Sequence, residues 1–226
     1  VLRDGRLLNT SGAAGGYFID FTMIPLTDVD RVEVVKGIGD ARYGNSLGGI
    51  LNLIPRRLPS ESPLTEFDLS AASFNTLGVN IYHAYKPGAF EYALTGRLTR
   101  SNGYLWNGNT NFGYSNTHLG YDFSFRGRLT VDVSYSRIKK GFIVSNRLSK
   151  SPDDPRYEQA KDPGFLPSDG EFMYGAMGAY PELGSWWTKY KWLFELGYEQ
   201  SFGREGVLSL FYWRNYGNRE AYNTRA

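Results

Sequence analysis

Apolar and polar side chains alternate along most of the chain from about residue 65 onward. In seven runs, apolar residues fill every second position, and polar or small residues fill the positions between them. An alternation of period two is typical of β-strands that have one apolar and one polar face. The pattern predicts strands over residues 67–72, 77–82, 90–99, 118–125, 129–136, 190–199 and 207–214.

The connections between these runs fall into a short class and a long class. The short ones comprise residues 74–76, 86–89, 126–127 and 203–206, and the long ones comprise 101–113 and 139–187. Apart from the first, short turns and long loops alternate, which places them at opposite ends of an antiparallel sheet. Bacterial outer-membrane barrels have this construction, with short periplasmic turns and longer extracellular loops.

Strand length also favours a membrane barrel. The predicted strands reach roughly ten residues, above the ~5–6 typical of globular proteins and close to the ~9–11 of a tilted membrane strand. The sequence therefore predicts a mainly β fold, in which an antiparallel transmembrane β-barrel is represented by about seven strands. Because bacterial barrels have at least about eight strands and an even number, we expect further strands outside this sequence.

The residues before about 58 have a different pattern, in which short β-branched runs lie between glycines. Val1 to Leu8 predicts a hairpin, because the pair Asp4-Gly5 favours a two-residue turn. Beyond it we expect a loop over 9–22, one helical turn over 25–28, and strands over 31–36 and 49–55.

Composition narrows the function classes. Aromatic residues make up 16% of the chain and 27 residues are glycine, which suits strands and turns with rings at a membrane–water interface. No apolar stretch approaches the ~18 residues of a transmembrane helix. The formal net charge of +2 gives no field for nucleic acid, and the lack of cysteine excludes a disulfide scaffold and a thiolate metal site.

One segment carries a specific motif. From Ile24 the chain reads IPLTDVDRVEVVKG, and from Asp40 it continues DARYGNSLGGILNLI. This order resembles the plug-domain signature of TonB-dependent receptors, although Ile38 stands where that family usually has Pro, and Arg56 replaces a common Thr-Lys ending. The residues that carry the resemblance are Arg31, Glu33, Gly37, Tyr43, Gly44, Gly48, Gly49 and Asn52.

The resemblance implies a domain organisation. Residues 1–57 would form the C-terminal part of a mixed α/β plug domain, and residues 65–226 would form the first part of the barrel. The Pro- and Ser-rich stretch 58–64 would be the linker between them. A complete barrel of this family would have about twenty-two strands around the plug.

The resemblance also implies a function. We expect TonB-dependent uptake of a scarce nutrient across the bacterial outer membrane, most readily an iron–siderophore-type complex, without enzymatic activity, cofactor or metal centre. The expected partners are outer-membrane lipid, the nutrient ligand, and the TonB energising complex, which would contact an N-terminal segment outside this sequence. Arg31 and Glu33 point to one face of a strand, and that face is expected to meet charged groups on the inner barrel wall; ordinary solvation is the alternative.

Aromatic residues near the long loops are candidates for substrate contact. They are Trp106, Tyr174, Tyr180, Trp186 and Trp187, and Asn107, which follows Trp106, is a further candidate. An equal alternative places them in an interfacial girdle. His118 is expected to face inward beside Asp122, as polar lining rather than as part of a catalytic triad. The acidic loop 146–187 lacks the spacing of a calcium site.

A soluble module remains the main alternative. A β-sandwich that binds carbohydrate would also be rich in Tyr and Trp, with Asn-Gly loops. The two classes differ in where the apolar face lies: a sandwich buries it, whereas a barrel exposes it to lipid.

Overall fold

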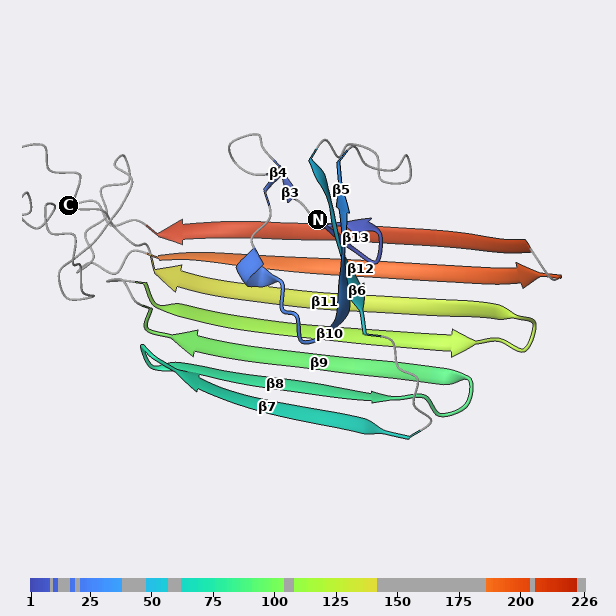
Figure 1. Cartoon of the computed structure of the whole chain (residues 1–226), viewed down its shortest axis with the longest axis horizontal. Helices are drawn as coiled ribbons and strands as arrows, with labels where there is room; N and C mark the ends of the chain where they lie inside the picture. Colours follow the sequence, from blue (N-terminus) through green and yellow to red (C-terminus); the bar gives the residue numbers. More distant parts are fainter. Residues whose placement is uncertain are drawn as a thin grey trace, which may run out of the picture.

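The computed structural model describes residues 1–8, 10–11, 17–18, 21–37, 48–56, 62–103, 108–141, 186–203 and 206–222. The described chain forms a small mixed sheet and a long seven-stranded sheet, and the strands of the small sheet run across those of the long one (Figure 1). No helix within these ranges is long and apolar enough to cross a lipid bilayer.

The small sheet contains four strands in the order β2-β1-β6-β5. They are β1 (Leu2–Arg3), β2 (Arg6–Leu7), β5 (Val29–Lys36) and β6 (Gly49–Pro55). The predicted hairpin is confirmed: β1 and β2 are antiparallel, and both turn residues, Asp4 (φ 47°) and Gly5 (φ 80°), have the positive φ that a type I′ turn requires. Strand β1 is parallel to β6, so the sheet is mixed.

The segment between β2 and β5 differs from the expected single loop and late helical turn. It contains two paired two-residue strands, β3 (Thr10–Ser11) and β4 (Tyr17–Phe18), and a 3₁₀ turn, η1 (Phe21–Met23). The helical turn therefore lies before Pro25 rather than over 25–28. A proline disfavours helical backbone in the residue that precedes it, and the chain instead makes a turn in which the Val29 N–H donates to the Leu26 carbonyl.

The seven predicted strands form one antiparallel sheet in sequence order. They are β7 (Leu64–Ala72), β8 (Thr76–Tyr85), β9 (Phe90–Ser101), β10 (Thr110–Asp122), β11 (Gly127–Gly141), β12 (Trp186–Phe202) and β13 (Gly206–Tyr222). The short connection between β7 and β8 lies at the same end as the long ones, as expected, and Phe74 and Asn75 have positive φ in it.

Several strand ends lie elsewhere than predicted. The two long connections shrink to 102–109 and 142–185, because β9, β11 and β12 are longer and β10 begins at Thr110 rather than near His118. The turn after β10 comprises 123–126, so it starts earlier than the expected Arg126-Gly127. The first half of β10 is rich in Asn and Gly, which have low strand propensity, and this composition obscured it.

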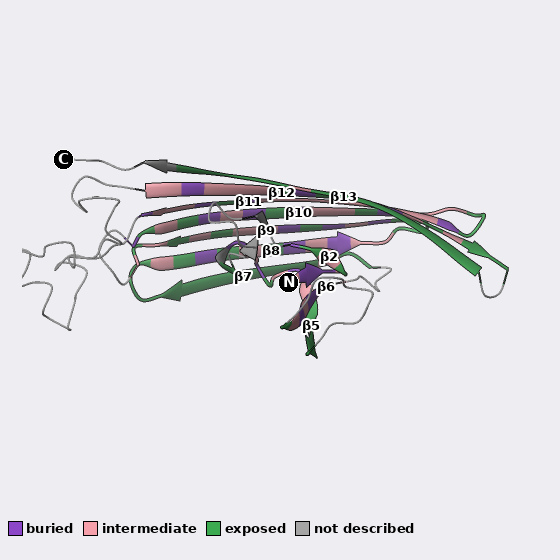
Figure 2. Ribbon diagram, turned by 90° about the horizontal axis from the view of Figure 1, so that it is seen from above, coloured by how far each residue is buried: buried purple, intermediate pink, exposed green. Residues whose placement is uncertain are grey.

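The long sheet has two different faces. We call the face that contacts the small sheet the inner face and the opposite one the outer face; Figure 2 shows β5 and β6 projecting from one side only. The inner face carries polar residues such as Asn116 and Ser136, both buried. The outer face carries the apolar half of the alternation, largely exposed: Phe67, Leu69, Leu77, Val79, Ile81, Leu94, Leu98, Leu119, Trp192, Phe194, Leu196, Leu208 and Leu210.

Candidate functional site at the interface of the two sheets

The most buried polar contact joins the small sheet to the inner face. Arg3, at the end of β1, donates to both carboxylate oxygens of Asp28, with Nη2 at 2.6 Å from Oδ2. The Tyr114 hydroxyl of β10 donates to the same oxygen at 2.9 Å. All three residues are buried, so Asp28 links an arginine of its own sheet to the wall of the long sheet.

The electrostatics of this triad keep Arg3 charged. Burial alone would lower the pKa of the Arg3 guanidinium, but Tyr114 and the Asp28 carboxylate raise that pKa above its ordinary value. A buried ion pair is costly to break from one side, because the remaining charge then lies in a low-dielectric environment without a partner. The triad is therefore a fixed attachment point.

A second polar attachment lies on β12 and β13. Arg6 forms an ion pair with Glu195, which is buried on the inner face. The carbonyl oxygen of Leu8 accepts a hydrogen bond of 2.7 Å from Lys191 and a longer one from Asn215. The hairpin β1–β2 therefore contacts the wall through a side chain and through its own backbone.

Two apolar clusters complete the interface. Met23 of η1 packs with Phe112, Tyr114 and Ile138, and Trp187 lies against this cluster. In the second cluster Leu8 and Leu53 pack with Leu193 of β12. The sequence analysis did not identify the residues of these two clusters or of the two polar attachments. Their only sequence signal is an apolar or charged side chain at a strand position that otherwise carries polar residues.

Three signature residues come together within the small sheet. Glu33 accepts from Arg31 at 3.1 Å and from the Asn52 amide at 3.2 Å, and Asn52 Oδ1 accepts the Gly5 N–H at 3.0 Å. Asn52 thus ties the first hairpin to β5. Within the described chain, the hydrogen bonds and ion pairs of Arg31 and Glu33 are all made inside the small sheet, so their predicted contact with a barrel wall stays a prediction.

The signature glycines frame β5 and β6. Gly37 (φ 91°) follows the end of β5, and Gly49 (φ 118°) starts β6 in a conformation that disfavours side chains. A Cβ on Gly49 would lie 2.7 Å from the Val35 carbonyl oxygen, whereas one on the adjacent Gly48 would meet nothing within 4 Å. Tyr43 and Gly44 lie outside the described residues.

The two adjacent tryptophans of β12 fall on opposite faces. Trp187 lies on the inner face against the Met23 cluster. Trp186 lies on the outer face, where the Lys139 ammonium is 4.4 Å from its ring centroid. Substrate contact by either ring therefore stays a prediction. Trp106, Asn107, Tyr174 and Tyr180 lie outside the described residues.

A network of charges covers the inner face near the short turns. His118 faces inward, but its Nδ1 contacts Asp132 at 2.9 Å and its Nε2 contacts Glu91 at 3.1 Å. The expected neighbour Asp122 instead binds Lys86 and Arg128. The expected pairing was wrong, because His118 and Asp122 are four residues apart on β10 and so roughly 13 Å apart along the strand. Asp132 lies directly opposite His118 in the register, and Glu91 is its diagonal neighbour on β9.

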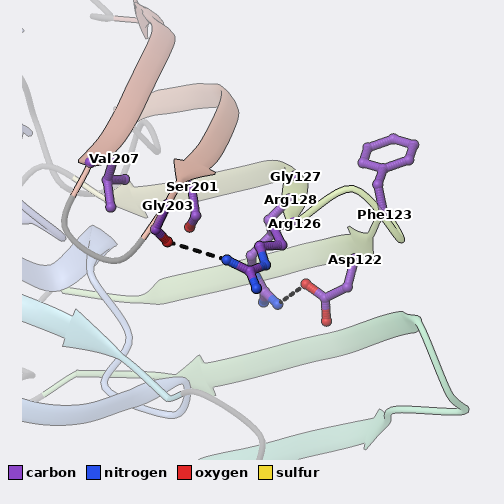
Figure 3. A pocket seen from close by; sticks show the side chains of 9 residues that line it. Asp122, Phe123, Arg126, Gly127, Arg128, Ser201, Gly203 and Val207 are labelled. Atoms are coloured by element: carbon purple, nitrogen blue, oxygen red, sulfur yellow. Dashed lines mark hydrogen bonds and ion pairs between the residues drawn. The ribbon is translucent and has the colours of Figure 1, made fainter.

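A shallow hollow of about 460 Å³ lies at the short-turn edge of the sheet. Figure 3 shows Arg126 directed toward the Gly203 carbonyl, to which it donates at 3.2 Å, and Arg128 paired with Asp122. Both guanidinium groups are therefore engaged by the chain itself. These contacts link two neighbouring turns and assign no ligand to the hollow.

Sequence comparison relates the first part of the chain to known proteins. The family described as TonB-dependent Receptor Plug Domain matches residues 1–50. A segment of 44 residues is 46% identical to the vitamin B12 transporter BtuB of Photobacterium profundum, and 57 residues are 44% identical to that of Vibrio cholerae. The segments cover 19% and 25% of this chain but only 7% and 9% of the two relatives.

Structure comparison covers nearly the whole chain. The ferripyoverdine receptor of the Pseudomonas aeruginosa outer membrane, bound to ferripyoverdine, superposes with a TM-score of 0.68 at 17% identity, over 97% of this chain and 28% of that one. Another structure, the P. aeruginosa receptor FpvA bound to pyoverdine, gives 0.64 at 17% identity, over 87% of this chain and 27% of that one. The predicted fold, part of a plug followed by antiparallel barrel strands, is confirmed.

Proposed function

Because this chain belongs to the TonB-dependent receptors of the bacterial outer membrane, we propose that the protein of which it forms part carries a scarce nutrient inward across that membrane in an energy-dependent way. The small sheet is then the plug, and the inner face of the long sheet lines the lumen. We place the boundary between the two at the linker 58–64.

The attachment of the plug to the wall supports this proposal above all. The buried Arg3–Asp28–Tyr114 triad and the Arg6–Glu195 pair hold the plug against two of the seven described barrel strands, β10 and β12. Such contacts close a lumen to passive diffusion. Passage of a cargo then requires work on the plug, which suits a transporter driven from the inner membrane rather than a passive pore.

For the cargo we propose an iron–siderophore-type complex. Two solved structures that superpose on most of this chain are receptors bound to pyoverdine and to ferripyoverdine. A cobalamin is the second candidate, because a stretch of the chain is 44–46% identical to vitamin B12 transporters. That stretch covers at most 57 residues, 25% of this chain, whereas cargo would also contact the extracellular loops.

Uptake assays separate these candidates. Cells that lack the receptor are supplied with the full-length gene and given either a radio-iron siderophore or radio-cobalt cyanocobalamin. We expect accumulation of one cargo, dependent on both the gene and TonB, with surface binding that persists when energy is removed. Accumulation that is equal without TonB would contradict active transport, and the absence of binding to either cargo would favour another nutrient such as an oligosaccharide.

The two neighbouring tryptophans provide a matched pair for the binding site. If Trp187 contacts the cargo, Trp187→Ala should weaken equilibrium binding by about tenfold or more, since buried tryptophans dominate many binding interfaces. Trp186→Ala removes the same side chain from the outer face and should leave the dissociation constant unchanged. Equal effects of the two substitutions would remove Trp187 from the site.

A further inference from the structure

A hollow on the outer face lies near the ends of β9, β10 and β11 that lead into the long connections. Its volume is about 620 Å³, and its floor includes Gly113 of β10. Leu98 of β9 lies directly opposite Gly113 on one side in the register, and Arg137 of β11 on the other. The hollow therefore faces away from the plug, toward the membrane.

The hollow arises from an inversion of the alternation. In the first half of β10, the apolar Phe112 and Tyr114 face inward, where they pack against Met23 of the plug. The outward positions are left to Asn111, Gly113 and Ser115, which are polar or small. The small side chains of this stretch therefore leave a depression in the lipid-facing surface between the larger side chains of β9 and β11.

The backbone does not require glycine at position 113. Gly113 does not have a positive φ, and a Cβ built there would make an ordinary contact of 3.6 Å with Leu98 Cδ2. The glycine therefore preserves space rather than a special conformation.

Three cations line this hollow. Arg100 and Lys139 flank Asn111 in one row of the register, and Arg137 lies in the next row. Because neighbouring strands are about 4.8 Å apart, Arg100 and Lys139 are attached roughly 10 Å from each other. Within the described chain, Arg100 and Arg137 form no ion pair, and Lys139 lies over the Trp186 ring.

The charge on this part of the outer face is one-sided. Among the described strand residues, the alternation leaves a single acidic side chain on the outer face, Glu220 of β13. It accepts a hydrogen bond from Tyr190 and lies two strands away from Lys139. Nothing within the described residues therefore neutralises the three cations.

The side of the hollow toward β8 is apolar. Leu77, Val79 and Leu98 line it from β8 and β9, in the same register rows as the cations. Tyr135 lines it from β11, one row further from the strand ends. A charge on the lipid face is costly at the bilayer midplane and nearly free near the interface, and these cations lie near the strand ends. The surface thus combines cationic groups near the strand ends with an apolar recess beside them.

We propose that this hollow binds a phosphorylated lipid of the outer leaflet, with phosphate groups on Arg100, Arg137 and Lys139 and an acyl chain over Gly113. Charge complementarity selects an anionic headgroup, and guanidinium groups suit phosphate oxygens in particular. The apolar recess selects a lipid over a free anion. The lipid would cover the region where β10 is least apolar and would hold the strands that carry the first long loop.

The test uses the full-length receptor in detergent and lipid A as the phosphorylated probe, with bound lipid counted by native mass spectrometry. Each cation near a membrane surface contributes about 1 kcal/mol of attraction to anionic lipid. We therefore expect the triple substitution Arg100→Gln, Arg137→Gln, Lys139→Gln to weaken binding by at least about tenfold. Replacing both arginines by lysine should retain most of it.

Two further variants separate the parts of the proposal. Gly113→Leu keeps every cation and fills the recess, so it should weaken lipid A binding while retaining heat-modifiable migration as a sign of a folded barrel. Arg97→Gln with Lys140→Gln removes two cations from inner-face positions of the same strands and should change nothing. This control also reports whether net charge alone governs binding.

Three outcomes would overturn the proposal. They are equal lipid A binding by the triple variant and the parent, equal competition by phosphatidylcholine, and equal competition by inorganic phosphate alone. The second outcome would show that only the acyl chains matter, and the third that the hollow is a free-anion site. None of these results depends on which cargo the receptor carries.

Discussion

At the scale of single residues, Asp28 is shared between the plug and the barrel wall. It is 3% exposed and serves Arg3 from its own domain and Tyr114 from the barrel wall. The bond to Arg3 neutralises a buried charge, whereas the bond to Tyr114 attaches the plug to the barrel. Substitutions at the two partners can therefore separate plug stability from plug attachment.

Replacing Asp28 by Ala should destabilise the plug by about 3–5 kcal/mol, because Arg3 would be left buried without its partner. The expected readout is increased entry of vancomycin, which an intact outer membrane excludes, into cells that express the full-length receptor. Asp30→Ala is the control: Asp30 is exposed and, among the described residues, its one ion pair is a 3.5 Å contact with Arg31. The substitution should therefore cost under about 1 kcal/mol. Equal permeability of the two variants would show that the triad does not keep the plug closed.

Tyr114→Phe removes only the bond between Asp28 and the wall. We expect a loss of about 1–2 kcal/mol, in the range for a hydrogen bond to a charged group, with the Arg3–Asp28 pair intact. Hydrogen exchange should then quicken in β5 and β6 less than it does in Asp28→Ala. A larger effect for Tyr114→Phe would place the main support of the plug in the wall rather than in the ion pair.

At the scale of elements, the alternation predicted every long strand and its antiparallel order, because each strand separates a lumen from lipid. The bounds of β6 agree with the prediction, since a run of Ile and Leu begins after two glycines and ends at a proline. The start of β10 was missed because its apolar Phe112 and Tyr114 face inward to meet the plug, while polar and small residues face outward. A pattern read along one strand cannot show that a separate domain will pack on its polar face.

The candidate site could be predicted only where it is local in sequence. Arg31, Glu33 and Asn52 do meet, because β5 and β6 pair directly and place Glu33 opposite Asn52. Arg3 and Asp28, by contrast, are 25 residues apart, and Arg6 and Glu195 are 189 apart. Such pairs depend on how the plug sits against the barrel, and one sequence does not contain that information in readable form.

Strand β6 depends on the backbone of its first residue. Gly49→Ala would combine a positive φ with a 2.7 Å approach to the Val35 carbonyl oxygen, so we expect a loss of about 1–3 kcal/mol. Gly48→Ala is the matched control, because its Cβ would meet nothing within 4 Å. Amide exchange of β5 and β6 in the full-length receptor measures both, and equal protection in the two variants would mean that β6 can shift without cost.

At the scale of the whole molecule, the orientation of β12 decides between a membrane barrel and a soluble sandwich. Trp192 lies on the outer face, 47% exposed and with Tyr135 at 4.5 Å between ring centroids, whereas Trp187 lies on the inner face against the plug cluster. Full-length variants that keep only one of these tryptophans should therefore respond differently to brominated lipids in proteoliposomes. Quenching of Trp192 with little quenching of Trp187 is the expected result, because bromine in the acyl chains reaches only the lipid-facing side. If both were quenched equally, the plug would not occupy the lumen; if neither were, the outer face would not meet lipid, and the apolar alternation would have to be buried in a protein core instead.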